Sequence, residues 1–262
     1  MDSLFDDTGR LLPRDGDRVY AKIDRRYFSL EKHQFELRST FERLTKFLVN
    51  PPTSLDYIDF ERQANQILEN ISLNQPMKNL LNATRVPFII PKINSQLDTN
   101  FNFFDLARPL NLSYREMFPS YEFKNFVSAE EGLDTQIVDS SRYRQLLEKA
   151  LVSDVVGWYF PNAMAGFAVP DQRRVMNRLP DNFILSGPLE ATISLIGNPS
   201  LLMKRDGKYP NLLCLSAVEP KKMKEKHFFF FYEAYGWNLY LNKRSMVGAV
   251  SEYFAGGLTV TI

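Results

Sequence analysis

The stretch HFFFFYEAYGWNLYL, residues 227–241, concentrates more aromatic surface than any other part of the chain, and it decides the fold. Phe228 to Phe231 and Tyr232 show no polar alternation, so a strand here needs apolar partners on both faces. The run is too short to span a membrane as a helix. We therefore predict the interior hairpin of a sheet, with strands at 227–233 and 237–241.

Two other segments are expected to extend this sheet. Residues 212–218 predict a strand that a charged connection joins to the aromatic run. If the turn centres near Met223, Glu219 lies opposite His227 and Cys214 lies opposite Tyr232. The final strand, LTVTI at Leu258 to Ile262, should be needed for soluble expression.

The N-terminal part reads as helical. Residues 1–28 mix charges with Gly and Pro and predict a loosely packed arm. Amphipathic periodicity then predicts a helix over about 29–49, a second from Ser54 and a third from Pro76. Three such helices with short loops favour an antiparallel bundle. Their apolar faces either pack within the chain or form a docking surface for another protein.

The remaining chain alternates short strands and helices. The pattern predicts strands at 86–90, 123–127, 136–138, 155–160, 166–169 and 183–185, and helices at 143–151, 170–180 and 188–197. Gly157 suggests a bulge, and Arg144 and Glu148 are spaced to pair on the wet face of their helix. Residues 92–121 are read as an irregular connection.

These elements predict an α+β fold, in which an N-terminal helical, bundle-like part precedes a mixed, mostly antiparallel sheet with packed helices. The expected organisation is an arm over 1–28, a helical subdomain over 29–84 and a sheet domain over 85–262. No flexible linker separates the last two, so they can also form one continuous domain.

Composition excludes several kinds of chemistry. The chain has 32 basic and 31 acidic residues, so no overall field draws it to nucleic acid or to a membrane, and we predict neither partner. One cysteine, Cys214 in the apolar run LLCLS, predicts a buried structural thiol. Two histidines cannot make a three-histidine metal site, and no nucleotide-binding glycine motif occurs, so we predict no metal and no cofactor.

Arginine and aromatic residues supply the remaining candidates for a site. Arg173 and Arg174 lie on one short helix, where paired guanidinium groups are able to hold a phosphate or a carboxylate; the alternative is a solvated helix face. Trp237 lies in the turn between two strands and is a candidate ligand-binding aromatic, or else part of the core. A basic segment follows the predicted strand 212–218 and contains Lys221, Lys222, Lys224 and Lys226. It either contacts an acidic partner or keeps the tip of a hairpin exposed to solvent.

Two functional hypotheses follow. The first is a non-enzymatic binding or protein-interaction module, with a possible protein partner on the N-terminal helices. The second is an enzyme with a dispersed acid/base or arginine site for a small phosphorylated or carboxylated substrate. The single cysteine and an acidic N-terminus without a signal-peptide pattern predict a soluble, cytoplasmic protein. The sequence leaves the oligomeric state open.

Overall fold

The aromatic stretch forms a hairpin at the middle of a sheet. A computed structural model describes residues 3–20, 35–48, 55–93, 103–128, 130–131, 134–203, 211–222, 228–245 and 248–262. Strand β8 (Phe229–Tyr235) pairs antiparallel with β9 (Asn238–Arg244). Gly236 and Trp237 make the two-residue turn, and both have positive φ, as in the type I′ turn that suits a twisted hairpin. The predicted hairpin is confirmed, although His227 lies outside the described residues.

Strand β8 is the central strand of a five-stranded mixed sheet, in the order β10-β6-β8-β9-β2. The other strands of this sheet are β2 (Phe123–Asn125), β6 (Leu212–Cys214) and β10 (Phe254–Gly256). The outer pairs β10–β6 and β2–β9 are parallel and the inner pairs are antiparallel. The side chains from Phe229 to Tyr232 are all buried, because both faces of the central strand are covered.

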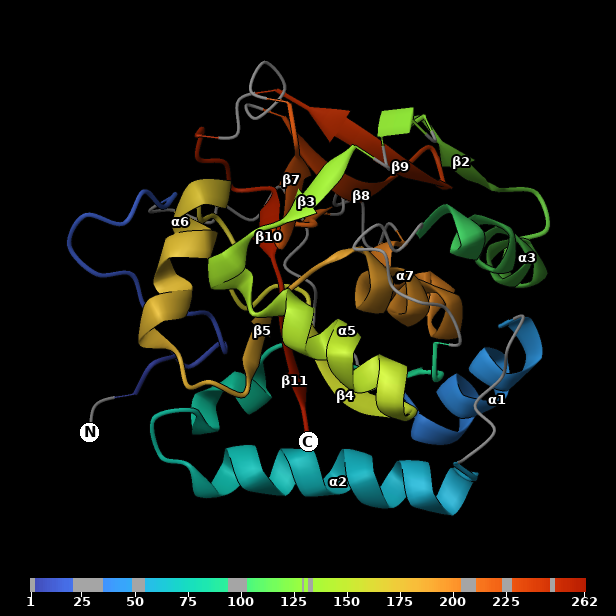
Figure 1. Cartoon of the computed structure of the whole chain (residues 1–262), viewed down its shortest axis with the longest axis horizontal. Coiled ribbons are helices and arrows are strands. Elements are labelled where there is room, and N and C mark those ends of the chain that lie inside the picture. Colours follow the sequence, from blue (N-terminus) through green and yellow to red (C-terminus); the bar gives the residue numbers. More distant parts are fainter. Residues whose placement is uncertain are drawn as a thin grey trace.

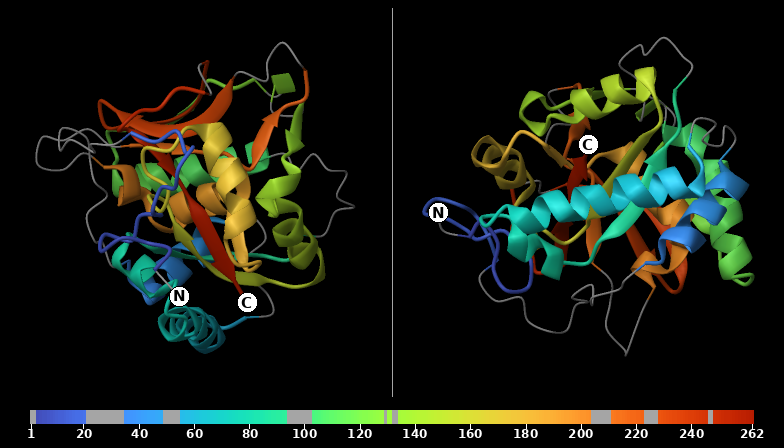
Figure 2. Two further views of the ribbon diagram at one scale, coloured as in Figure 1. Left: turned by 90° about the vertical axis from the view of Figure 1, so that its left-hand side faces the viewer. Right: turned by 90° about the horizontal axis from the view of Figure 1, so that it is seen from below.

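A second sheet is antiparallel throughout and has the order β1-β4-β11-β5. Its strands are β1 (Val86–Ile90), β4 (Val155–Phe160), β5 (Phe183–Leu185) and β11 (Leu258–Thr261), and every residue in them is buried. Strand β11 lies between β4 and β5, so the last strand of the chain is an interior strand. A separate pair, β3 (Thr135–Ile137) with β7 (Val218–Pro220), lies at the outside of the molecule (Figures 1 and 2).

Helices pack against these sheets. The α-helices are α1 (Leu37–Phe47), α2 (Tyr57–Leu73), α3 (Ala107–Met117), α5 (Tyr143–Val152), α6 (Val169–Val175) and α7 (Pro188–Gly197). Short 3₁₀ turns are η1 (Lys78–Asn82), η2 (Phe103–Leu106), η3 (Asp139–Ser141), η4 (Met176–Arg178) and η5 (Pro199–Leu202). Helix α2 crosses the base of the molecule (Figure 1) and lies over β4, where Trp158 Nε1 donates to the Ala64 carbonyl oxygen at 2.8 Å. The fold is α+β.

The helical and sheet parts share one hydrophobic core. Leu44 of α1 and Phe60 and Ile67 of α2 belong to the same buried cluster as Phe88 of β1 and Trp158 of β4. Helix α7 is buried over its whole length and contacts α1, α3 and β1. Within the described residues, the apolar faces of α1 and α2 are therefore filled by the protein's own core. No helix of the described residues is long and apolar enough to cross a membrane.

Several predicted elements differ from those observed. The third predicted helix is only the 3₁₀ turn η1, and 166–169 forms an isolated bridge between Phe167 and Val19 instead of a strand. The predicted irregular connection contains α3, in which Pro109 occupies the first turn and Leu110 and Tyr114 are buried. Gly157 marks no bulge: it stays in register opposite Phe88, whose ring occupies the space that a Cβ would need.

The predicted strand 212–218 is broken in two. Strand β6 pairs with β8, whereas β7 turns away and pairs with β3. Cys214 therefore lies opposite Phe231 instead of Tyr232, and Glu219 is not part of the hairpin that contains β8. The prediction was wrong by one residue because it assumed one continuous strand on either side of the charged connection.

The described part of the N-terminal arm is tightly packed, contrary to the prediction. Phe5 and Leu11 form an isolated bridge and have almost no exposed surface. Val19 pairs with Phe167, and Arg10 Nε donates to the Ala165 carbonyl oxygen at 2.7 Å. The scattered apolar residues of this segment reach the core even though they lack a regular period.

One ionisable side chain is completely enclosed by the core. Glu190, in the first turn of α7, has no exposed surface, and one carboxyl oxygen accepts the Gly187 backbone N–H at 2.5 Å. Among the described residues, its Oε2 and the nearby Tyr159 hydroxyl find no hydrogen-bond partner. Burial raises the pKa of Glu190 to about 8, although the hydrogen bonds it accepts from Gly187 and its neighbours oppose that shift. Glu190 is thus neutral in the folded protein near pH 7.

Candidate functional site

Arg173 is anchored inside the protein. Its Nε donates to the Ser216 carbonyl oxygen at 2.9 Å, and Nη2 donates to the Val218 carbonyl oxygen at 3.0 Å. Its Nη1 lies 2.6 Å from Glu219 Oε2. Burial lowers the pKa of Arg173, and the Glu219 carboxylate opposes that shift. The Arg173 guanidinium therefore fixes the turn before β7 and the strand itself onto α6.

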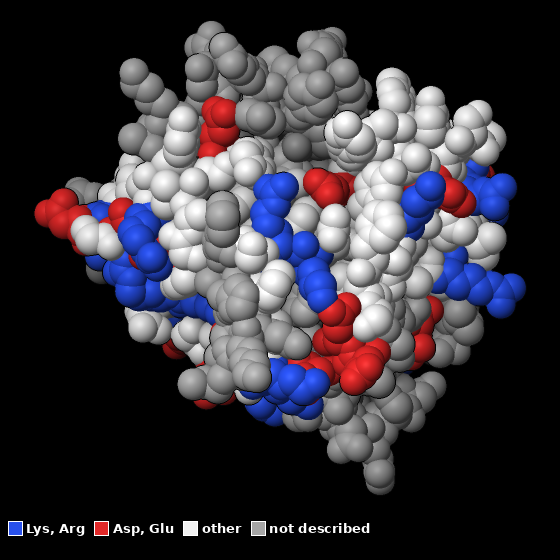
Figure 3. Space-filling model, turned by 90° about the horizontal axis from the view of Figure 1, so that it is seen from above, with Lys and Arg blue, Asp and Glu red and all other residues white. Residues whose placement is uncertain are grey.

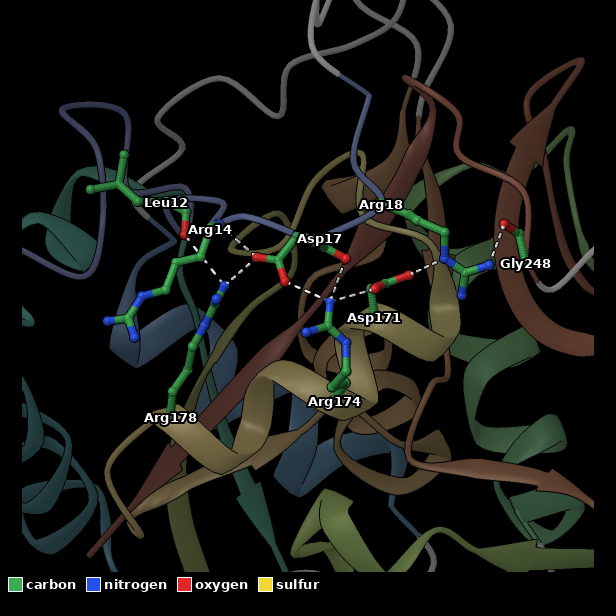
Figure 4. A network of polar contacts seen from close by, with 9 residues as sticks. Leu12, Arg14, Asp17, Arg18, Asp171, Arg174, Arg178 and Gly248 are labelled. Atoms are coloured by element: carbon green, nitrogen blue, oxygen red, sulfur yellow. Dashed lines mark hydrogen bonds and ion pairs between the residues drawn. The ribbon is translucent and has the colours of Figure 1, made fainter.

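Arg174 belongs to a chain of ion pairs that ties the N-terminal arm to α6 (Figure 4). Its Nη2 lies 2.7 Å from Asp17 Oδ1 and 2.7 Å from Asp171 Oδ1. Arg178 Nη2 reaches the other oxygen of Asp17 at 2.6 Å, and Arg18 Nε reaches Asp171 Oδ2 at 2.7 Å. Three arginines share two aspartates in this network, which acts as a clamp between the N-terminal arm and the segment 171–178.

Trp237 lies at the tip of the β8–β9 hairpin. Its ring stacks on Tyr121, with ring centroids 5.7 Å apart and planes 20° apart. Its backbone oxygen accepts a hydrogen bond from the Tyr114 hydroxyl at 2.6 Å. The side chain is half exposed, so Trp237 partly covers the neighbouring aromatic residues.

The three residues chosen from the sequence do not lie in one site. Arg173 and Arg174 share α6, but their guanidinium groups contact β7 and the N-terminal arm respectively, and Trp237 lies at the end of β8. Trp158, the other tryptophan, lines a cleft beside α2 instead. Ligand binding by Arg173, Arg174 and Trp237 stays a prediction, and none of the three residues lines the two clefts described below.

A cleft of about 570 Å³ follows the edge of β3. Six consecutive residues, 135–140, form one side of it, and the cleft is completed by Arg144, Glu219 and Lys221. β3 provides the first three of these residues and η3 begins at Asp139. The cleft is therefore lined by a continuous length of backbone as well as by side chains.

The register of β3 with β7 shows which backbone groups face the cleft edge. Val138 N–H donates to the Ala217 oxygen and Lys221 N–H to the Asp134 oxygen, both toward the β3–β7 pair. Because alternate residues of a strand point their backbone groups to opposite sides, Ile137 directs its groups away from β7. The N–H of Asp139, which follows the extended Val138, points the same way, whereas the Asp139 carbonyl oxygen accepts from the Arg142 N–H within η3. Among the described strands, β7 is the only neighbour of β3. Within the described ranges, no second strand pairs with the outer edge of β3.

The charged side chains of this cleft differ in whether they form ion pairs. Glu219 is held by Arg173 and also accepts a hydrogen bond from Gln136 at 2.8 Å. Arg144 is exposed and has no ion pair among the described residues; the predicted partner Glu148 does not contact it. On the upper face of the molecule, positive and negative side chains are interspersed (Figure 3). Arg144 is thus a local positive charge available to a ligand.

Other candidate groups have no such setting. Cys214 is buried, and burial raises the pKa of its thiol to about 12, which keeps it protonated and unreactive. No cluster of three or more His, Cys, Asp or Glu side chains with the arrangement of a metal site occurs in the described ranges. His33 and His227 lie outside those ranges.

Sequence reasoning missed most of this cleft. Gln136 was predicted only as a strand residue, and Arg144 as half of a surface ion pair. The short polar run at 135–140 carries no local signal of a site, because its character depends on pairing with β7, which lies about 80 residues away. Of the cleft residues, the sequence singled out Lys221 as a contact for an acidic partner and Glu219 at the end of the expected hairpin. Comparison with family models, with curated proteins and with solved structures finds no match to this chain.

Proposed function

We propose that this protein is a protein-interaction module that binds an extended segment of another protein along the outer edge of β3. The observation that supports the proposal is the cleft lined by residues 135–140, beside a strand edge with which no other described strand pairs. An extended peptide adds to such an edge through backbone hydrogen bonds, and side-chain contacts provide the specificity. No catalytic group is required.

The charges favour an acidic partner segment. Arg144 lies in the cleft without an ion pair among the described residues, and Lys221 adds a second positive charge. Of the two carboxylates, Glu219 is already paired with Arg173, which leaves Asp139 as the opposing charge. An aspartate or glutamate of the bound segment next to Arg144 would form a charge-assisted hydrogen bond. The partner is thus expected to present an extended acidic stretch.

The substitution Asp139→Pro removes one outward N–H group with little disturbance of the fold. Val138 has φ −76° and ψ 122°, which is the extended conformation that a residue before proline prefers. Position 139 begins a 3₁₀ turn, where proline is well accommodated. Asp139→Ala is the matched control, because it removes the same carboxylate but retains the N–H.

The experiment selects random displayed dodecapeptides on the wild-type protein and measures their affinity for both variants. We expect the selected peptides to carry acidic residues and to bind Asp139→Pro about fivefold or more weakly than Asp139→Ala, since a backbone hydrogen bond is lost. Arg144→Glu should abolish the preference for acidic peptides. Equal binding to the two position-139 variants, or no enrichment, would overturn the proposal. So would a concentration-dependent dimer that only Asp139→Pro dissociates, because the occupant would then be a second copy of the chain.

The alternative, an enzyme acting on a small phosphorylated or carboxylated substrate through Arg173 and Arg174, has no observation in its favour at those residues. Both guanidinium groups are engaged by carboxylates and carbonyl oxygens of the protein itself.

A further inference from the structure

A second cleft, of about 380 Å³, lies between the start of α1, one face of α2 and Trp158 of β4. It is lined by polar and apolar side chains, namely Phe35, Glu36, Leu37, Arg38, Tyr57, Glu61, Asn65, Leu68, Arg85 and Trp158. Three aromatic rings and two leucines provide apolar walls, and two arginines and an asparagine provide hydrogen-bond donors. This cleft is separate from the one along β3 and shares no lining residue with it.

Arg85 distinguishes this cleft. Its guanidinium is partly buried, donates to the Leu81 carbonyl oxygen at 2.6 Å and has its Cζ atom 5.9 Å from the centroid of the Trp158 ring. It forms no ion pair with any described carboxylate, although Glu36 and Glu61 also line the cleft. A guanidinium carries five N–H donors, so most of those of Arg85 remain available to a ligand.

A comparison with the other partly buried arginines shows how Arg85 differs. Burial lowers the pKa of Arg10, Arg43, Arg173 and Arg85. For the first three, a carboxylate of the protein opposes the shift, namely Asp6, Glu116 and Glu219. For Arg85, burial is the only cause. Among the described residues, Arg85 is therefore the desolvated arginine that lacks a counter-charge, an arrangement that costs free energy until an anion binds.

The rest of the cleft suits the organic part of such an anion. Arg38 Cζ lies 4.0 Å from the centroid of the Tyr57 ring, so a cation–π contact with the Arg38 guanidinium holds this ring in place. The Tyr57 hydroxyl donates to Glu61 Oε1 at 2.7 Å, so the Glu61 carboxylate already has a hydrogen-bond partner within the cleft. Leu37 and Leu68 are partly buried beside them. These walls are apolar and rigid enough to contact a flat hydrocarbon group.

We propose that this cleft binds a small organic anion, with its carboxylate or phosphate group on Arg85 and its apolar body between Tyr57 and Trp158. Guanidinium groups bind both kinds of anion through paired hydrogen bonds. The proposal does not depend on peptide binding at β3.

The sequence provides a reporter for this cleft. The chain has two tryptophans, so Trp237→Phe leaves Trp158 as the only one. In that background, the fluorescence of Trp158 is titrated with phenyl phosphate, benzoate and neutral benzyl alcohol at constant ionic strength. We expect a saturable change with at least one anion and at least tenfold weaker binding of benzyl alcohol, which has the same ring without the charge. The stronger of the two anions identifies the headgroup.

Variants then locate the anion. Arg85→Gln should weaken binding at least tenfold, and Arg85→Lys, which keeps the charge but not the planar fork, should weaken it less. The matched control is Arg62→Gln on α2, an exposed residue whose partner is Asp59 and which does not line the cleft. If neither anion causes a saturable change, or if benzyl alcohol binds as tightly as both anions, the proposal is wrong. Equal weakening by Arg62→Gln and Arg85→Gln would also overturn it.

Discussion

Arg178 and Asp17 are 161 residues apart in the sequence, and Arg178 Nη2 lies 2.6 Å from Asp17 Oδ2. The Asp17 side chain has no exposed surface in this position. Together with Arg174 it connects the N-terminal arm to α6, so the arm is held both by buried Phe5 and Leu11 and by paired charges. The contacts of Asp17 with Arg174 and Arg178 join segments that no local pattern relates.

Replacing Asp17 with Asn should destabilise the protein by about 1–2 kcal/mol, because two charge-assisted hydrogen bonds are lost and solvent near Arg174 screens part of the effect. Burial raises the pKa of Asp17, but hydrogen bonds from the Arg14 backbone and from Arg178 outweigh it and lower the pKa overall. A lowered pKa stabilises the fold above about pH 4 and loses that effect as pH falls through the folded value. Urea unfolding at pH 7 and pH 3 should show the difference between variant and wild type shrinking in acid. A constant difference would contradict this assignment.

Glu190 should produce the opposite dependence. Its pKa is raised to about 8 in the fold, so the stabilisation is complete below the unfolded value near 4.3 and is lost as pH rises toward 8. The stability of the wild type should fall by up to about 1.4 kcal/mol per pH unit within this window, relative to Glu190→Gln. Chemical denaturation at pH 5.5 and pH 8 measures this. Parallel pH profiles for the two proteins would show that Glu190 is ionised in the fold.

Strand β11 should be indispensable, because it pairs with β4 on one side and β5 on the other. Removing Leu258 to Ile262 takes the buried side chains of Leu258 and Val260 out of the core, leaves β5 without a partner among the described strands and leaves β4 paired only with β1. We expect loss of soluble, cooperatively unfolding protein, measured by the soluble fraction and by thermal unfolding. Removal of the exposed Ile262 alone is the control and should leave both nearly unchanged. A soluble, cooperative protein without 258–262 would refute the prediction.

Trp237 should be strained in the hairpin turn. Its φ of 73° is unfavourable for a bulky residue, whereas its stacking on Tyr121 is favourable. In a Tyr121→Ala background the stacking is absent, so Trp237→Asn should stabilise the protein by about 0.5–1 kcal/mol. In the wild-type background the two effects should nearly cancel. Thermal unfolding of the four proteins in this double-mutant cycle tests the difference in sign. Destabilisation in both backgrounds would mean that packing outweighs the backbone strain.

Much of the local structure follows from the sequence. Helix α7 begins at Pro188 after Gly187, and α5 presents Tyr143, Leu146, Leu147 and Ala150 at helical spacing, as the pattern predicts. The unbroken apolar runs that become β1, β4 and β8 correctly indicated strands covered on both faces. These elements were predictable because their period, length and flanking Gly or Pro residues lie within a few residues of one another.

Tertiary structure alone decided the rest. The break between Cys214 and Val218 depends on β7 pairing with β3, and the open edge of β3 that lines the larger cleft depends on the same pairing. Arg173 and Arg174 looked available in the sequence, but their carboxylate partners come from β7, from the N-terminal arm and from α6 itself. Arg85 looked ordinary, yet the fold partly buries it without a counter-charge among the described residues. Which charges are paired and which strand edges stay open depends on contacts between distant segments, and no local period records those contacts.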